Sequence, residues 1–491
     1  MSSNDMASIP LGLTYDDVLI TPQHSTVRSR REVNTATRIS RNIKLNIPIV
    51  ASNMDTVCER RMAIAMAREG GIGIIHRFCS VEEQCAMVRE VKRAQSFLIE
   101  NPRVILPHQS AKEALEGLQW SGRVGGVSCL MVVDSPKSRK LLGIISRRDV
   151  VLADPNATVA SLMVPVNKMV VTTNTAITIE EVTKLLRESR SSNIPILGPN
   201  GELLYLVTLS DVLKLTRNKA ASLDSRGRLL VGAAVGVKEG DMKRAISLVD
   251  AGADVLVVDI AHGHSDLCID MIKKLKSNPR TMHIDVIAGN IATGEGAEAL
   301  INAGADGLKV GVGPGSICIT RLVAGAGVPQ LSAVLACTRV ARRHNVPCIA
   351  DGGLRTAGDI CKAIGAGADA VMLGNILAGT DEAPGRVLVK DGQKVKIIRG
   401  MAGFGANLSK AERERTLDED VFSSMVPEGV EGSVPCKGPV APILHQLVGG
   451  LRSGMSYTGA KTVGEMQRKT RFTRMTGAGL RESGSHGVSK L

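Results

Sequence analysis

The amino-acid sequence predicts an α/β protein, built on a closed barrel of eight parallel strands into which a second domain is inserted. Short apolar segments alternate with helical patterns along much of the 491 residues, which is typical of a parallel sheet. Aromatic residues make up only 2 % of the chain, so the core must consist of Val, Ile, Leu, Ala and Met. These residues suit strands that are buried on both faces. One interruption, at residues about 95 to 220, is too long for a loop and indicates the inserted domain.

The first two strand candidates lie at residues 47–51 and 72–75, separated by the helical pattern ERRMAIAMAREG. Six more apolar runs follow in the second half of the chain, at residues 229–234, 255–258, 284–288, 308–310, 348–350 and 370–373. The helical patterns between them are DMKRAISLVDAGA, HSDLCIDMIKKLKS, TGEGAEALINAGA, LSAVLACTRVARRH and TAGDICKAIGAGA. The string AGAD recurs at Ala251, Ala303 and Ala366, where its glycine suits the left-handed end of a helix.

Two strands and six make eight, the number that closes a TIM barrel, the (β/α)8 fold. Its active site lies at the C-terminal ends of the strands. The predicted strand ends carry residues that suit a site: Ser52, His76, Asp259, Asn290, Gly311, Asp351 and Gly374. An open, doubly wound sheet is the alternative arrangement of the same elements.

The inserted domain separates the barrel segments 1–94 and 221–491, and it contains two similar halves, about 97–155 and 160–218. LLGIISRRDVV in the first half is similar to LLYLVTLSDVL in the second half. Each copy places a hydroxyl residue three positions before an aspartate: Ser146 and Asp149, then Thr208 and Asp211. Such a pair is also the capping box that begins an ordinary helix.

The chain carries 61 Lys and Arg against 48 Asp and Glu, a net charge of +13. These basic residues are dispersed and aromatic stacking residues are nearly absent, so nucleic acid is not expected as the main ligand. Excess positive charge does suit small anionic substrates such as nucleotides. No apolar run is long enough for a membrane span. Ten scattered cysteines without C-x-x-C pairs argue for reduced thiols and against structural zinc.

The chain ends in Ser489-Lys490-Leu491, the signal that the peroxisomal targeting receptor reads. The residues before it are small and polar, so the signal is expected to be accessible. The sequence therefore predicts the peroxisome, or a related organelle such as the glycosome, and otherwise the cytoplasm.

The segment KVGVGPGSICITR, residues 309–321, ends a strand in alternate glycines and then places Ser316, Cys318 and Thr320 at every second position. Glycines allow positive φ and a close approach to a ligand. A cysteine in such a loop is a candidate nucleophile, although a cysteine is often just a small buried apolar residue. The chain has other cysteines in apolar patterns that are typical of a core: Cys268, Cys348 and Cys361.

Four motifs together resemble the IMP dehydrogenase/GMP reductase family: GPGSICITR, IADGGLRTAGDI, ASNMDTV and VPEGVEG. The inserted domain resembles a pair of cystathionine-β-synthase-type (CBS) domains, which bind adenine or guanine nucleotides. The resemblance implies purine nucleotides as effectors, with Asp149 and Asp211 holding ribose hydroxyls beside Ser146 and Thr208.

In this family the resemblance implies that Cys318 attacks C2 of the purine to form a thioimidate, while Thr320 and Glu428 assist proton transfer. Asp351 would hold the ribose diol, although it also suits a turn. The implied substrate-binding residues are Ser52, Met54, Ser316, Asp351, Gly352, Gly353, Gly374, Asn375, Gly400 and Met401. The implied cofactor-binding residues are Asp259, Ala261, His262, Gly263, Asn290 and Gly311.

The resemblance further implies a monovalent cation, K⁺, held by backbone carbonyls of three residues and by three residues of a neighbouring chain. These are Gly313, Gly315 and Cys318, with Glu482, Ser483 and Gly484. It also implies a homotetramer that can pair to an octamer. The family commonly has a tyrosine that contacts the phosphate where this chain has Ile398, so that contact is not expected here.

A mobile flap, at residues about 400–428, distinguishes the two reactions of the family. The dehydrogenase oxidises IMP with NAD and hydrolyses the thioimidate with an Arg-Tyr pair, whereas the reductase expels ammonia from GMP and reduces the same intermediate with NADPH. This flap has Glu414-Arg415-Thr416 and no tyrosine, since the tyrosines of the chain are Tyr15, Tyr205 and Tyr457. PQLSAV, residues 329–334, also resembles the reductases.

We therefore expect the reductase reaction with NADPH. The inserted domain and the passage VPEGVEGSVPCKGP resemble the dehydrogenase, and Arg413 or Arg415 could act as its base, so NAD-dependent oxidation of IMP is the alternative. A nucleotide-sensing protein without catalytic activity is a third interpretation, against which the intact set Cys318, Thr320 and Glu428 argues.

Overall fold

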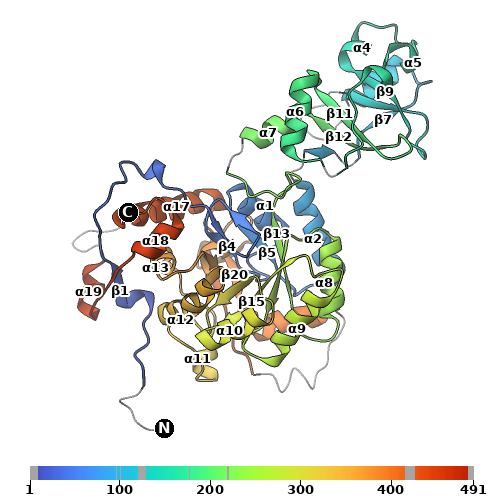
Figure 1. The fold of residues 1–491 in the computed structure, drawn as a ribbon. Coiled ribbons are helices and arrows are strands. Elements are labelled where there is room, and N and C mark those ends of the chain that lie inside the picture. The colour runs from blue at the N-terminus through green and yellow to red at the C-terminus, as the bar shows by residue number, and fades with distance from the viewer. Residues whose placement is uncertain are drawn as a thin grey trace. The chain divides into compact units, whose positions relative to one another are not determined.

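The computed structural model describes residues 9–94, 97–99, 101–119, 129–175, 177–217, 220–414 and 426–484. The chain forms two compact units (Figure 1). The first contains Met1–Ala94, Ala220–Ser222 and Leu229–Leu491, and the second contains Gln95–Lys219 and Leu223–Arg228. Within the described ranges, every helix is too short or too polar to cross a membrane.

The first unit is built on a closed barrel of eight parallel strands, which confirms the predicted fold class. Neighbouring strands follow the order β13-β14-β15-β16-β17-β18-β4-β5. Their bounds are Val231–Val235, Val255–Asp259, Asp285–Ile291, Gly307–Val310, Cys348–Asp351, Ala370–Leu373, Ile49–Ala51 and Ile72–Ile75. The strand predicted from residue 229 begins two residues later, because the Leu230 amide donates to the Ser222 carbonyl at 3.0 Å instead of entering the barrel.

Aliphatic side chains fill the inside of the barrel. Val50, Ile72, Ile74, Val257 and Met372 belong to one cluster and are at most 1 % exposed. The interior is therefore a packed core, as is usual for such barrels.

Helices connect the strands on the outside of the barrel (Figure 1). They are α1 (Arg60–Arg68), α2 (Val81–Ala94), α8 (Asp241–Asp250), α9 (Asp266–Ser277), α10 (Gly294–Asn302), α12 (Gln330–Arg343), α13 (Ala357–Gly365) and α14 (Asn375–Ala378). The three AGAD glycines adopt the predicted left-handed conformation, with φ of +97° at Gly252, +106° at Gly304 and +110° at Gly367.

Further elements extend the barrel unit. A three-stranded antiparallel sheet consists of β19 (Leu388–Lys390), β20 (Gln393–Arg399) and β21 (Glu431–Pro435), and α15 (Phe404–Glu414) follows β20. The long helix α17 (Val440–Tyr457) packs on α13. The remaining elements are η2 (Tyr15–Asp17), β1 (Val18–Ile20), η3 (Arg30–Glu32), β2 (Thr37–Arg38), β3 (Lys44–Leu45), α11 (Thr320–Val323), α18 (Val463–Lys469), β22 (Phe472–Arg474) and α19 (Gly477–Glu482).

The second unit contains two small sheets, with strand orders β10-β9-β8-β7 and β11-β12-β6. Although β6 starts the first half of the repeat, it pairs with β12 of the second half, and β10 pairs back with β9. The elements are β6 (Leu98–Ile99), β7 (Val104–Ile105), α3 (Ala111–Gln119), β8 (Cys129–Val133), β9 (Leu141–Ser146), α4 (Arg147–Val151), α5 (Val159–Leu162), β10 (Val164–Pro165), η4 (Val166–Lys168), α6 (Ile179–Ser189), β11 (Asn193–Leu197), β12 (Leu203–Thr208) and α7 (Leu209–Arg217).

Candidate active site

A cavity of about 500 Å³ opens at the C-terminal ends of the barrel strands. Its wall combines the residues after β4 and β14, the glycine loop after β16, and the segments at the ends of β20 and β21. Most of the predicted site residues line it: Ser52, Met54, Asp259, Ala261, Asn290, Gly311, Gly313, Gly315, Cys318, Thr320, Asp351, Gly352, Gly400, Met401 and Glu428. The barrel thus gathers residues that are far apart in the sequence at one end of the fold.

The loop after β16 requires glycine where it passes its neighbours most closely. A Cβ atom on Gly311 would lie 2.1 Å from the carbonyl oxygen of Asp351, and one on Gly313 would lie 2.6 Å from Cγ of Arg321. Both glycines also have positive φ, +150° and +81°. Since a backbone oxygen cannot move aside as a side chain can, only glycine fits at position 311. The loop then carries Cys318 into the cavity wall.

Cys318, Thr320 and Glu428 form a continuous chain of polar contacts. The Sγ atom of Cys318 lies 3.2 Å from Oγ1 of Thr320, which donates to Oε2 of Glu428 at 2.7 Å. The backbone holds the two segments together, since the Ile319 amide donates to the Glu428 carbonyl at 2.8 Å. Because the Thr320 hydroxyl donates to the carboxylate, its oxygen is free to accept from the thiol. A proton can therefore pass from Cys318 toward Glu428.

Cys318 also differs from most other cysteines in its exposure. Cys318 and Cys436 are half-buried, whereas the other eight are buried. Burial raises the pKa of Cys268, Cys337 and Cys361 to about 12, so these thiols stay protonated at neutral pH. Of the two half-buried thiols, that of Cys318 lines the cavity.

A buried lysine that the sequence pattern did not single out lies among the polar residues of the cavity. Lys309, on β16, donates from Nζ to Oδ1 of Asp259 at 2.8 Å and to Oδ2 of Asp351 at 3.1 Å. It also contacts Oδ1 of Asn290, whose Nδ2 donates to Asp351 at 2.9 Å. Burial alone would raise the pKa of Asp259, but the charges of Lys309 and Arg77 hold it below its ordinary value.

The ends of β16 and β17 are fixed by a second buried side chain. Nε2 of Gln330, at the start of α12, donates to the carbonyl oxygens of Val310 at 2.8 Å and of Asp351 at 3.1 Å. Gln330 belongs to the motif PQLSAV, which the sequence analysis used only for its resemblance to the reductases. Its side chain supports the loop that carries Cys318.

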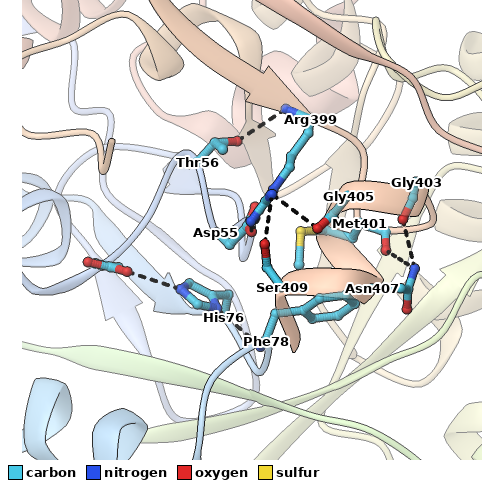
Figure 2. A network of polar contacts seen from close by, with 11 residues as sticks. Asp55, Thr56, His76, Phe78, Arg399, Met401, Gly403, Gly405, Asn407 and Ser409 are labelled. Atoms are coloured by element: carbon cyan, nitrogen blue, oxygen red, sulfur yellow. Dashed lines mark hydrogen bonds and ion pairs between the residues drawn. The ribbon is translucent and has the colours of Figure 1, made fainter. Parts of the chain in front are cut away.

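Arg399 fastens the wall on the side of α15 (Figure 2). Its guanidinium donates from Nε to Oδ2 of Asp55 at 2.8 Å, and from Nη1 to the Gly405 carbonyl and to Oγ of Ser409, both at 3.1 Å. Asp55 follows β4 and is 4 % exposed at its side chain. On the same helix, Nδ2 of Asn407 donates to the Met401 carbonyl at 3.2 Å (Figure 2). Two walls of the cavity, after β4 and after β20, are thereby joined.

Comparison with known proteins identifies the fold and site described above. Residues 12–486 match the model of the "IMP dehydrogenase / GMP reductase domain". The chain belongs to this family. The resemblance predicted from the four motifs is thereby confirmed.

Relatives within the family include reductases of similar length. The chain is 73 % identical over 486 residues to a GMP reductase from Leishmania donovani, with 99 % of each chain covered. It also resembles the crystal structure of the C318A variant of GMP reductase from Trypanosoma brucei in complex with guanosine 5′-monophosphate. That match has a TM-score of 0.85 and 79 % identity and covers 99 % of this chain and 100 % of the other. A Trypanosoma brucei GMP reductase in complex with guanosine 5′-triphosphate matches with a TM-score of 0.74 and 70 % identity, covering 96 % and 100 %.

Four residues that the family resemblance assigns to substrate lie outside the lining of the main cavity: Ser316, Gly353, Gly374 and Asn375. Nδ2 of Asn375 donates to Oγ of Ser316 at 3.1 Å, so two of them are in direct contact. Nζ of Lys437, which the sequence pattern did not single out, donates to the Asn375 carbonyl at 2.9 Å. The substrate-binding role of the four residues stays a prediction.

The remaining predicted cofactor and cation residues occupy two other places. His262 and Gly263 follow β14, and the Gly263 amide donates to the Asn290 carbonyl at 2.7 Å. Glu482 ends α19, which contacts η2, and Ser483 and Gly484 follow it. The predicted cation site combines residues of two chains and stays a prediction.

The hydroxyl–aspartate pairs of the second unit form helix caps, as the simpler interpretation predicts. The amide and the hydroxyl of Ser146 both donate to Oδ2 of Asp149 at 2.7 Å. Oγ1 of Thr208 donates to Oδ2 of Asp211 at 2.6 Å. These caps begin α4 and α7, and the nucleotide-binding role of the two aspartates stays a prediction.

The flap is described in part. Arg413 and Glu414 belong to the last turn of α15, whereas Arg415 and Thr416 lie outside the described residues, as does the C-terminal signal at 489–491. Ile398, at the position of the family's phosphate-contacting tyrosine, is 2 % exposed and packs in the core.

Proposed function

We propose that this enzyme is a GMP reductase, which converts GMP to IMP and ammonia with NADPH as reductant. The observation that carries the proposal is the contact chain Cys318–Thr320–Glu428 in a cavity of this family. The 73 % identity to the Leishmania donovani GMP reductase supports the reductase over the dehydrogenase. The GMP-bound C318A structure from Trypanosoma brucei supports GMP as the substrate.

The proposal gives each residue of the candidate site a task. The Cys318 thiolate adds to C2 of the purine, and the C2–N bond breaks as ammonia leaves with a proton delivered through Thr320 and Glu428. Asp259 and Asn290 would hold the nicotinamide nucleotide, which would supply the hydride to C2. The C2–S bond then breaks, which releases IMP and returns the thiolate of Cys318. Asp351 and Asp259, which both accept from Lys309, can also accept hydroxyl donors such as those of ribose.

We infer that the cavity holds a purine nucleotide together with the nicotinamide end of a dinucleotide. Its volume of about 500 Å³ and its two carboxylate acceptors suit ribose groups from two ligands. NADPH is proposed over NADH on the resemblance to the reductases.

The dehydrogenase alternative needs a base that activates water. In the family this base is an arginine, and a tyrosine is its usual partner. Tyr15 is fully buried, Tyr205 lies on β12 of the second unit, and Tyr457 ends α17. None of the three lines the cavity. Without the tyrosine, hydrolysis of the thioimidate is expected to be slow.

The purified enzyme is expected to oxidise NADPH and release ammonia when GMP is added, and to form little or no XMP from IMP and NAD. Absorbance of the reduced nicotinamide measures both directions, and an ammonia assay checks the stoichiometry. The matched control replaces NADPH by NADH. Robust XMP formation with no GMP-dependent NADPH oxidation would falsify the reductase assignment and leave the dehydrogenase, with Arg413 or Arg415 as base.

We also propose that purine nucleotides regulate the enzyme through the second unit, as CBS-type domains do. The guanosine 5′-triphosphate complex of the Trypanosoma brucei GMP reductase supports a nucleotide triphosphate as an effector. The caps are made through Oδ2 of Asp149 and of Asp211. Because an ionised carboxylate has two oxygens and about four acceptor positions, one aspartate can cap its helix and accept from ribose at the same time.

Asp149→Ala or Asp211→Ala is expected to raise the concentration of GTP or ATP that gives the half-maximal effect by about 5- to 150-fold, the usual range of coupling between sites. The basal rate should not change, because both residues belong to the second unit. Steady-state rates over an effector titration measure this. A deletion of residues 95–219 with Ala94 joined to Ala220 is the control. If that deletion variant still responds like the full chain, the regulatory assignment is wrong.

Three further assignments rest on the sequence. We propose import into the peroxisome or glycosome through the C-terminal Ser489-Lys490-Leu491, a K⁺ site at the catalytic loop, and a homotetramer that pairs to an octamer. The SKL signal, the backbone carbonyls of the glycine loop, and the family resemblance support them respectively.

A further inference from the structure

Lys309 is buried at the centre of the candidate site, and its charge faces two carboxylates. The side chain is 3 % exposed, against 20 % for Asp259 and 19 % for Asp351. Burying an ammonium costs free energy unless it is paired. Here the three acceptors of Nζ are side-chain oxygens from three neighbouring strands, namely Asp259 on β14, Asn290 on β15 and Asp351 on β17.

The two carboxylates depend on Lys309 in turn. Burial by itself favours the neutral acid, and two carboxylates that share one neighbour repel each other. The other charged and polar groups that face this cluster, within the described part of the chain, include Arg77, which donates to the Asp259 carbonyl at 3.4 Å, Asn53, Asn290, Gln330, the Cys268 thiol and the buried phenol of Tyr15, which interacts with Asp351. Among them only Arg77 is cationic, and it is Lys309 that bridges the two carboxylates through a single ammonium.

We propose that Lys309 is a positioning residue that orients Asp259 and Asp351 as hydroxyl acceptors for the ribose of a bound nucleotide and whose charge keeps Asp259 ionised. Lys309 takes no part in bond making at C2. It acts through the two carboxylates, since its three N–H donors are directed at these two groups and at Asn290. The inference rests on the proposed function for the identity of the nucleotide.

A charge-removing variant, Lys309→Met, gives the proposal its signature. Without the ammonium, burial dominates and the pKa of Asp259 rises above its ordinary value. The carboxylate then takes up a proton as pH falls through that raised pKa, and ribose loses an acceptor. Because Asp259 is the carboxylate assigned to the nicotinamide ribose, kcat/KM for NADPH is expected to fall at least tenfold more at about pH 6 than at about pH 9, whereas the wild-type profile lacks this ionisation.

Two further variants separate this role from a merely structural one. Lys309→Arg keeps the cation and is expected to restore the wild-type pH profile, although its activity falls because the guanidinium is larger. Lys92→Met is the matched control. Lys92 is 4 % exposed and donates to Asp254 at 2.6 Å, but Asp254 precedes β14 at the other end of the barrel. Its loss should lower Tm without adding an ionisation.

A binding measurement completes the test and does not need turnover. Calorimetric titration of NADPH into Lys309→Met in two buffers of different ionisation enthalpy is expected to show a proton release that wild type lacks. Lys309→Gln, which keeps a donor but not the charge, replaces Lys309→Met if the latter does not fold. The inference would be overturned if Lys309→Met and Lys309→Gln both showed the same pH profile and the same proton balance as wild type. Absence of GMP-dependent NADPH oxidation in wild type would instead overturn the proposed function.

Discussion

Cys318→Ala is expected to abolish turnover, with kcat reduced by at least about 10³-fold, because the thioimidate cannot form without the thiol. GMP binding should remain within about tenfold of wild type, since the ribose and phosphate contacts do not involve the sulfur. Steady-state NADPH oxidation measures the first quantity and calorimetric titration of GMP measures the second. Residual activity above a few per cent would exclude covalent catalysis by Cys318.

Cys436→Ala is the matched control for this variant. Cys436 is the other half-buried cysteine and lies next to β21, outside the cavity lining. Its replacement is expected to leave kcat and KM unchanged. Labelling with a thiol reagent should modify both cysteines in wild type, while saturating GMP protects Cys318 alone.

Glu428→Gln is expected to reduce kcat by about 10²- to 10⁴-fold, the usual contribution of general acid–base catalysis. The amide keeps the size of the side chain but cannot take up the proton that Thr320 passes on. Thr320→Val should have a comparable effect, because it removes the hydroxyl between the 3.2 Å and 2.7 Å contacts. Steady-state kinetics measures both variants.

The double variant Thr320→Val with Glu428→Gln tests whether the two residues act as one relay. If they do, the double variant is no slower than the slower single variant, since either change breaks the same path. Fully multiplicative losses would mean two independent roles. Glu431→Gln is the control: this exposed carboxylate lies on the neighbouring β21 and does not line the cavity, so its loss should leave kcat unchanged.

Much of the fold was predictable because the local signals agree with the barrel. Each strand candidate is a short apolar run, and glycines such as Gly252 and Gly304 end the preceding helices with positive φ. The small strands of the second unit were harder to predict from the sequence. β6 has two residues and pairs with β12, more than 100 residues away in sequence, so neither length nor periodicity reveals it.

The site was predictable where a residue type itself suggests chemistry, as for Cys318 in its glycine loop. Lys309, Asp55 and Arg399 were missed because their importance lies in contacts across the barrel. Lys309 sits within an apolar strand, where nothing in the sequence indicates that two carboxylates face it. Arg399 and Asp55 are 344 positions apart, and they meet because the fold places the end of β20 beside the residues after β4.

Closure of the barrel by β18 and β4 sets the order of events on the ribosome. Ile49 pairs with Val371, so at ~5–20 residues per second the first strand waits roughly 15–65 s for its partner. During that time Ile49, Val50 and Ala51, all fully buried in the finished enzyme, form an exposed apolar edge that invites aggregation. The second unit draws on a nearly continuous stretch of chain and can fold during the delay. We therefore expect the yield of native enzyme to depend on whether the nascent β4 segment stays protected from other chains during this delay.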